Sequence, residues 1–452
     1  MSQHTPKELG TEKISTLLLK YAVPAVIAMT ASSLYNMVDS IFIGRGVGAL
    51  AISGLAVTFP IMNLSAAFGA MIGVGGATLL SVRLGQKDNE AAQNVLGNVV
   101  TLNVILGVIF AIVALLLIDP ILIFFGASEN TISYARDYMV IILIGNVVTH
   151  LYLGLNSVLR ASGHPAKAMM ATIATVIVNT ILDPIFIFVL HMGIKGAATA
   201  TILAQIMALI YVSVLLSNKN ELIHFKRGSY KLKSRITKNI IAIGMSPFCM
   251  QVCACLVVIL INNGLKNHGG DLAIGAYGIN NRILFLFIMI VNGITQGMQP
   301  IAGYNYGAKK YDRVNEVLKR AIIYATAVMV VGFCACEFAT EWIIGWFTSD
   351  SQLIAIAVEG MQIMVAIFPL IGFQIVVGNF FQSIGMPKKS IFMSMTRQLL
   401  FLVPMLIILP QFLGTTGVWL SMPVADLLSV AVGATMIYRF YKSGAYSNSG
   451  QI

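Results

Sequence analysis

The stretch Asn179-Thr180-Ile181-Leu182-Asp183-Pro184 decides how the rest of the chain is interpreted. It lies in an apolar run from about Ala168 to Leu190, which is long enough to cross a bilayer. Asp183 would then be an ionisable side chain inside a membrane, where such groups are costly and usually functional. Pro184 has no N–H, so the Thr180 carbonyl one turn back loses its helical partner. Asn179 and Asp183 share a helix face. This layer of oxygens would suit a proton or a small cation; the alternative is a structural Asp at a broken helix.

Composition places the whole chain in a membrane. Of its 452 residues 57% are hydrophobic and only 10% are charged, a balance foreign to soluble domains of this size. The net charge of +11 then reflects membrane topology and does not indicate nucleic-acid binding. The five cysteines all fall in apolar runs, which favours packing over metal binding. We expect no cofactor and no resident metal, with a sodium ion at Asp39 and Asp183 left open as an alternative to a proton.

Apolar runs of about 20 residues predict an all-α polytopic membrane protein with twelve transmembrane helices. The expected spans are 15–43, 52–82, 91–118, 131–159, 166–190, 196–217, 237–264, 273–298, 314–342, 353–383, 388–410 and 417–439. One long basic connector divides them into an N-lobe, residues 1–217, and a C-lobe, residues 239–452, with residues 218–238 between.

The distribution of Lys and Arg along the chain predicts how the protein is oriented in the membrane. Most of the 29 Lys and Arg residues fall in the termini, the connector and the loops that would share one side of the membrane. By the positive-inside rule we expect both termini and the connector to be cytoplasmic. The connector could also hold anionic lipid headgroups, although its role as a topology determinant is the simpler interpretation.

The two halves repeat each other. At a shift of 222 residues Gly75 matches Gly297, and at a shift of 223 Pro24 matches Pro247. Each repeat has six predicted spans, so both would enter the membrane from the same side. This pattern predicts two parallel six-helix repeats around a central cavity.

Several motifs together resemble one transporter family. They are Tyr35-Asn-Met-Val-Asp39, Leu159-Arg-Ala-Ser-Gly163-His-Pro165, the Asn179 to Pro184 stretch and Gly297-Met-Gln-Pro300. The chain resembles the multidrug and toxic compound extrusion (MATE) family, and within it the bacterial MepA-like and DinF-like branches. The resemblance implies a multi-pass antiporter of the bacterial cytoplasmic membrane. It would act as a monomer and export cationic amphipathic compounds in exchange for protons or sodium ions.

The resemblance also implies a cation-coupling site and a hinge. Helix one would bend near Pro24. The coupling site would contain Tyr35, Asp39, Asn179, Asp183 and Thr201. Counting helical rise supports one layer, because Asp39 lies about 9 Å inside Arg45 and Thr201 about 9 Å inside Lys195. Burial and mutual repulsion would oppose ionisation of both carboxyl groups, so we expect the pair to titrate together.

Other side chains could line the substrate cavity. Flexible methionines and flat aromatics suit a promiscuous apolar site. The candidates are Met37, Met62, Arg282, Phe285, Met289, Gln374 and Asp426. Arg282 and Asp426 lie at matched depth and could instead form a structural ion pair. Arg397 has no obvious partner, and His150 is expected to be hydrogen-bonded rather than to relay protons.

Two other functions can be compared with export. A flippase for lipid-linked oligosaccharides would need several cations in its cavity, whereas this chain has few within its spans and an acidic layer in the N-lobe. A membrane enzyme would need a nucleophile and base, a metal cluster or a phosphate loop, and the sequence contains none. We therefore expect a transporter of organic cations and not an enzyme.

Overall fold

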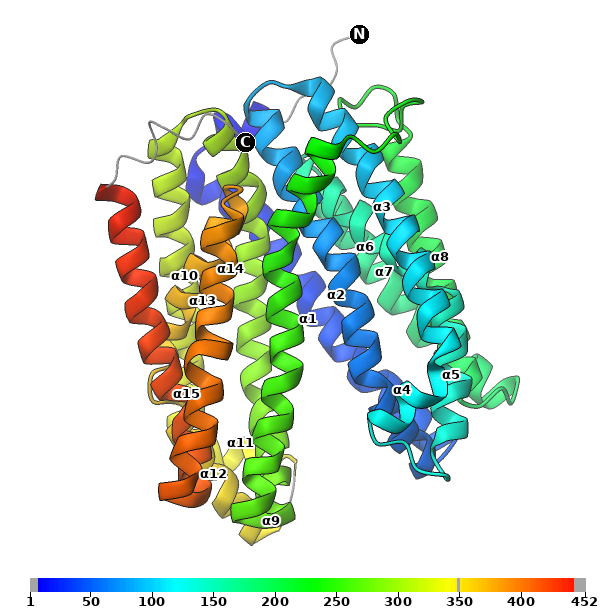
Figure 1. The fold of residues 1–452 in the computed structure, drawn as a ribbon, viewed down its shortest axis with the longest axis vertical. Helices are drawn as coiled ribbons and strands as arrows, with labels where there is room; N and C mark the ends of the chain where they lie inside the picture. Colours follow the sequence, from blue (N-terminus) through cyan, green and yellow to red (C-terminus); the bar gives the residue numbers. More distant parts are fainter. Residues whose placement is uncertain (1–6, 348–349, 443–452) are drawn as a thin grey trace. The chain divides into compact units, whose positions relative to one another are not determined.

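The computed structural model describes residues 7–347 and 350–442, apart from the side chains of residues 7, 36–38, 40, 41, 44, 45, 49, 52 and 271. The regular elements of the described residues are helices (Figure 1), and the chain divides into two compact units. Unit 1 contains Met1–Thr11 and Ile27–Phe248. Unit 2 contains Glu12–Val26 and Cys249–Ile452.

The helices of the first half are η1 (Lys7–Gly10), α1 (Ile14–Gly46), α2 (Ala49–Gly85), α3 (Asn89–Leu116), α4 (Ile118–Phe124), α5 (Ile132–Ile144), α6 (Asn146–Ala161), α7 (Pro165–Pro184), the π-helix η2 (Ile185–Val189) and α8 (Ile194–Leu216). Those of the second half are α9 (Ser234–Gly307), α10 (Tyr311–Phe338), α11 (Thr340–Ile344), α12 (Ser351–Val365), α13 (Phe368–Ser383), α14 (Pro387–Met395), the π-helix η3 (Thr396–Leu402) and α15 (Val403–Lys442).

Length and hydropathy give nine candidate membrane spans among the described residues, or eleven when the bent pairs α5–α6 and α12–α13 each count as one. One of the nine runs from Pro387 to Lys442 and is broken at Gly414, so it contains the last two predicted spans. The predicted spans 131–159 and 353–383 are not straight helices, because they bend by 54° and 55°. An all-helical membrane protein is confirmed.

The internal repeat is visible in the backbone. Eight of the described residues with positive φ form four pairs that are 221 or 222 positions apart. They are Gly48 and Gly270, Lys87 and Lys309, Gly163 and Gly385, and Gly193 and Gly414. Left-handed backbone is costly for residues other than glycine, so paired Lys87 and Lys309 indicate one turn used twice.

Glycines hold the exchanged helix ends in place. The first part of α9 packs in unit 1, where a Cβ on Gly244 would overlap the main chain of Met71 and one on Gly75 would overlap that of Ile240. In unit 2 a Cβ on Gly297 would overlap Ala22. Such close approach is the usual way in which membrane helices pack. The beginnings of α1 and α9 are therefore exchanged between the two compact units.

Candidate functional site

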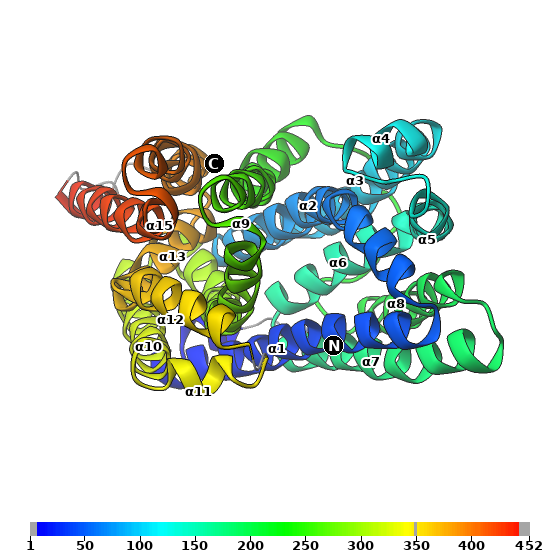
Figure 2. The same ribbon diagram turned by 90° about the horizontal axis from the view of Figure 1, so that it is seen from below.

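The site is built from four helices of unit 1. Asp39 comes from the later part of α1, Tyr138 from α5, Asn179 and Asp183 from α7, and Thr201 from α8. Helix α8 packs against both α5 and α7, and a hydrogen bond from α1 joins α8. Figure 2, which looks along the helices, shows α1, α7 and α8 as neighbours within this unit.

Asp39 and Asp183 lie in direct contact. Asp183 is fully buried and Asp39 is 7% exposed. The two carboxyl groups lie within hydrogen-bonding reach of each other. Two carboxylates have only acceptor atoms, so a hydrogen bond between them would require a proton on one of the two groups. The contact is therefore suited to hold one proton between two buried acids.

A ring of neutral polar groups surrounds the acids. The Asn179 Nδ2 atom donates to the Asp183 Oδ1 atom at 3.1 Å and lies 3.5 Å from the Thr201 Oγ1 atom. The Tyr35 hydroxyl lies 3.2 Å from the same Thr201 oxygen, whose own proton goes to the Ala197 carbonyl at 3.1 Å. Thr201 can thus only accept from Tyr35 and Asn179.

Three oxygens of the site have no hydrogen-bond donor among the described residues. They belong to Asp39 (Oδ1), Asp183 (Oδ2) and Asn179 (Oδ1), and all three are buried. Buried acceptors without donors are rare and require an explanation. A bound proton or a cation coordinated by oxygens would satisfy them.

The structure thus brings together all five residues that the sequence nominated, Tyr35, Asp39, Asn179, Asp183 and Thr201. It also adds Tyr138, which the sequence interpretation missed. Tyr138 is 2% exposed and lies next to Thr201 and near both acids, Asp39 and Asp183. The only signal in the sequence is a tyrosine within an apolar run, which is too common to single out.

The chain stays helical beyond Pro184. The α-helical geometry of α7 ends at Pro184, and the π-helix η2 continues from there to Val189. π-helices are often found at functional sites, because they relocate side chains and free main-chain groups. The broken-helix alternative for Asp183 is therefore incomplete, since Asp183 also contacts a second acid.

Comparison with known proteins agrees with this architecture. The MatE family model matches residues 24–185 and again residues 247–408, two segments that are offset by 223 residues. The chain belongs to the MatE family. The same offset relates Pro24 to Pro247, which confirms the repeat predicted from the sequence.

Individual MatE relatives cover almost the whole chain. The multidrug export protein MepA of Staphylococcus haemolyticus is 28% identical over 93% of this chain and 92% of its own length. The MATE multidrug transporter DinF-BH, solved in complex with a ligand, is 36% identical, covers 97% of this chain and 98% of its own, and has a TM-score of 0.89. An outward-facing MATE transporter of the MOP superfamily has a TM-score of 0.92 at 23% identity, covering 99% and 100% of the two chains. The chain is a transporter of the MatE family and not an enzyme.

The cavity candidates fall in both units. Met62 packs against an apolar cluster of unit 1, whereas the side chain of Met37 lies outside the described residues. In unit 2, Arg282 and Phe285 are exposed, Met289 is half-buried and Gln374 is buried. Their role in a substrate cavity stays a prediction.

The alternative of an ion pair between Arg282 and Asp426 is contradicted by the structure. Asp426 does not pair with Arg282: the Arg397 Nε atom donates to the Asp426 Oδ1 atom, and Asp426 is almost fully buried. Arg397 therefore has the partner that the sequence interpretation could not find. Counting depth along straight helices failed because Arg397 lies in a π-helix and the chain turns at Gly414 before it reaches Asp426.

His150 behaves as expected. It is fully buried, and its Nε2 atom lies 3.1 Å from the Ser65 hydroxyl. Ser65 also donates to Asn146, which in turn donates to the Gly107 carbonyl at 3.1 Å. This network joins α2, α3 and α6, and it supports the predicted hydrogen-bonded role.

Proposed function

We propose that this MatE transporter is a secondary antiporter that exports cationic amphipathic compounds in exchange for protons or sodium ions. The observation that carries the proposal is the contact between Asp39 and Asp183, two buried acids close enough to share one proton. A single site that holds a proton or another cation, and exchanges it when its access changes, is the minimum device for antiport.

The coupling site would work as one unit. With the proton or a sodium ion bound, the pair carries one negative charge less than when both acids are bare. Bare buried carboxylates repel each other and are poorly solvated, so the empty site favours any state in which water or a new cation reaches it. The oxygens of Tyr35, Asn179 and Thr201 would complete the coordination of a sodium ion.

Pro24 would serve as a hinge. The boundary between the compact units crosses α1 between Val26 and Ile27, two residues after this proline. It crosses α9 between Phe248 and Cys249, one residue after Pro247, the repeat partner of Pro24. Each proline removes one main-chain hydrogen bond from its helix, which makes bending there less costly. Alternating access would bend α1 at this point.

The substrate class follows from charge and from the relatives. An acidic coupling site disfavours anionic cargo, and MepA and DinF-BH are named as multidrug transporters. We place the chain in the cytoplasmic membrane of a bacterium, as its staphylococcal relatives suggest, with both termini and Lys226 in the cytoplasm. Labelling of a cysteine at position 226 from outside intact cells would contradict that orientation.

Transport by everted membrane vesicles tests the function directly. Vesicles that contain the protein should accumulate a fluorescent lipophilic cation such as ethidium when a proton gradient or a sodium gradient is imposed. Imposing the two gradients separately identifies the coupling ion. No accumulation under either gradient, from well-expressed protein, would refute antiport of organic cations.

A further inference from the structure

The connector between α8 and α9 is fixed to α3 through its main chain. Asn98 of α3 is fully buried, and both the nitrogen and the oxygen of its carboxamide form hydrogen bonds to this part of the chain. Its Nδ2 atom donates to the Lys231 carbonyl at 3.1 Å. Its Oδ1 atom accepts from the Lys233 main-chain N–H at 3.0 Å and from the Thr237 hydroxyl at 3.1 Å. A buried amide with this many partners holds the segment in one conformation.

Two more residues of α3 continue this anchoring. Gln93 bonds both main-chain groups of His224, accepting from its N–H at 3.3 Å and donating to its carbonyl. The Thr101 hydroxyl donates to the Tyr230 carbonyl at 2.8 Å. The main chain from residue 224 to residue 233 therefore follows α3 over more than two turns.

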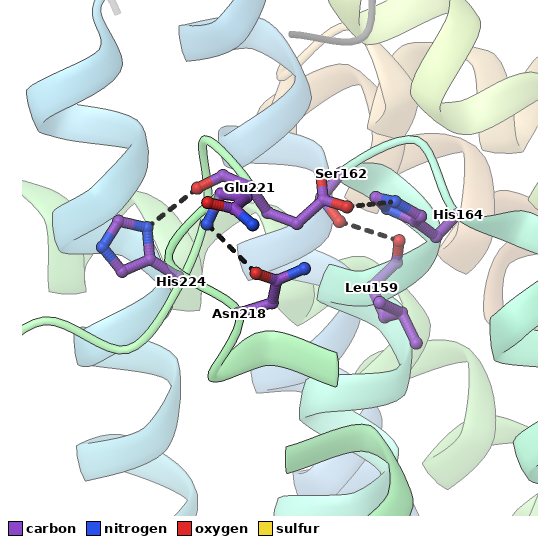
Figure 3. A network of polar contacts seen from close by, with 7 residues as sticks. Leu159, Ser162, His164, Asn218, Glu221 and His224 are labelled. Atoms are coloured by element: carbon purple, nitrogen blue, oxygen red, sulfur yellow. Dashed lines mark hydrogen bonds and ion pairs between the residues drawn. The ribbon is translucent and has the colours of Figure 1, made fainter. Parts of the chain in front are cut away.

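A further anchor lies at the start of the connector (Figure 3). The His164 Nε2 atom lies 3.2 Å from the Glu221 carboxylate, and the His224 ring bonds to the Glu221 carbonyl at 2.9 Å. Burial lowers the pKa of His164, an effect that Lys167 reinforces and that Glu221 and Glu8 oppose. The connector is thus tied to both the α6–α7 turn and α3.

The fixed segment presents cations and apolar side chains outward. We define the connector surface as six exposed residues: Lys226, Arg227, Tyr230, Lys231, Leu232 and Arg235. Tyr230 is 39% exposed and Leu232 is 45% exposed. The four cations form no ion pair with a described residue, whereas the neighbouring Lys233 lies 3.7 Å from Glu90.

The connector surface lies at the level where the apolar face of α3 begins. The Thr101 hydroxyl bonds to the Tyr230 carbonyl. The exposed apolar residues of α3 start three residues later at Val104, which is 36% exposed, and continue through Ile105 and Ile109. Three residues of helix correspond to about 4.5 Å. In a bilayer whose hydrocarbon begins at this apolar face, Tyr230 and Leu232 would lie beside the boundary between headgroups and hydrocarbon, a level that tyrosine favours.

We propose that the connector surface binds the headgroups of anionic phospholipids. A topology determinant needs only positive charges on one side of the membrane, and neither a fixed main chain nor exposed tyrosine and leucine contributes to it. Uncompensated cations next to interfacial apolar side chains match a lipid phosphate with its acyl chains below. A soluble anionic partner would leave Tyr230 and Leu232 unexplained.

Lipid binding to the purified full-length protein in detergent tests this proposal. Phosphatidylglycerol, phosphatidylcholine and inorganic phosphate would be titrated separately, with bound lipid counted by native mass spectrometry and thermal unfolding followed in parallel. Wild type should retain phosphatidylglycerol and not phosphatidylcholine, and phosphate alone should give no shift in unfolding temperature. Equal retention of the two lipids, or an equal shift with phosphate, would overturn the proposal.

A matched pair of variants localises the site. Replacing Lys226, Arg227 and Lys231 by Gln should weaken phosphatidylglycerol binding by about a hundredfold, on the order of fivefold for each cation near the surface. The control replaces three exposed lysines elsewhere, Lys87, Lys309 and Lys388, by Gln and should lose far less. Equal losses in both variants would mean that net charge alone attracts the lipid, and the proposal would fail.

A second variant covers the case in which charge removal disturbs folding or orientation. Tyr230→Ser with Leu232→Ser keeps every charge of the connector and so keeps its effect on topology. We expect about a tenfold loss of phosphatidylglycerol binding from the lost apolar contact. Unchanged binding in this variant would refute the interfacial position that the proposal requires.

Discussion

Replacing Asp183 by Asn separates the coupling role from a structural one. The side chain is fully buried, and its Oδ1 atom accepts from Asn179 at 3.1 Å. Asn has nearly the same shape and keeps this acceptor. Its new N–H group can donate to Asp39, which has an oxygen without a donor among the described residues. Such a bond to a charged group contributes about 1.5–3 kcal/mol, so the fold should not lose stability.

The same bond should abolish coupling. The amide N–H of the new Asn would bond to Asp39 just as a protonated Asp183 would. Unlike a carboxylic acid, this amide cannot release its proton. That free energy corresponds to a shift of about tenfold to a hundredfold in the equilibrium between loaded and empty sites. We therefore expect Asp183→Asn to express normally and to lose at least about tenfold in gradient-driven efflux. Asp39→Asn should behave alike, and the double variant should be little worse, because residues that act as a unit are not additive.

Everted vesicles with a fluorescent cation provide the assay, at matched protein levels. The control is Asp137→Asn, the same chemical change on an exposed α5 residue that lies 3.3 Å from Lys195. It should transport normally. Efflux by Asp183→Asn within about twofold of wild type would refute the coupling role and leave Asp183 as a structural residue of α7.

Three further predictions concern other groups. Tyr138→Phe removes a buried hydroxyl next to Thr201 and should cost about 1–2 kcal/mol of unfolding free energy; an unchanged denaturation midpoint would show that the hydroxyl is not needed. Asp426→Asn leaves the Arg397 guanidinium without its charge partner and should cost about 3 kcal/mol, and Arg397→Met in the same chain should recover much of that loss of thermal stability. Burial lowers the pKa of His164, so the unfolded state takes up its proton first and stability falls as the pH drops below about 6.5; His164→Gln should show a smaller fall in unfolding temperature between pH 7.5 and 5.5, and an equal fall would assign the acid sensitivity to other groups.

The sequence predicted the features that depend on local rules. Long apolar runs located the spans, and repeated glycines and prolines located the turns, because few other residues fit left-handed or proline backbone. Asn179 and Asp183 were placed on one face because helix geometry fixes their spacing. The grouping of Asp39 and Thr201 in one site agreed with a depth estimate made from helical rise alone.

Features that depend on the packing of distant segments were not predicted. Tyr138 joins the site because α5 packs on α8. A single tyrosine in an apolar run does not indicate which neighbouring helix its side chain faces. The pairing of Asp426 with Arg397 was missed because Arg397 lies in a π-helix, which changes which residues share a helix face. The bends within α5–α6 and α12–α13 were not predicted, because hydropathy averaged over a whole span does not indicate where a helix bends.

The exchange of helix ends between the compact units has a consequence for biosynthesis. The segment Glu12–Val26 leaves the ribosome well before the second half of the chain, yet it packs in unit 2. The Arg313 guanidinium, which donates to the Glu12 carbonyl at 2.7 Å, lies 301 residues later. At about 5–20 residues per second this partner is made roughly 15–60 s afterwards. Until then Leu17 and Tyr21, both fully buried in the finished protein, have no native neighbours from the second half of the chain. The amino-terminal helix must therefore enter the membrane in one environment and move to another once the second half has been translated.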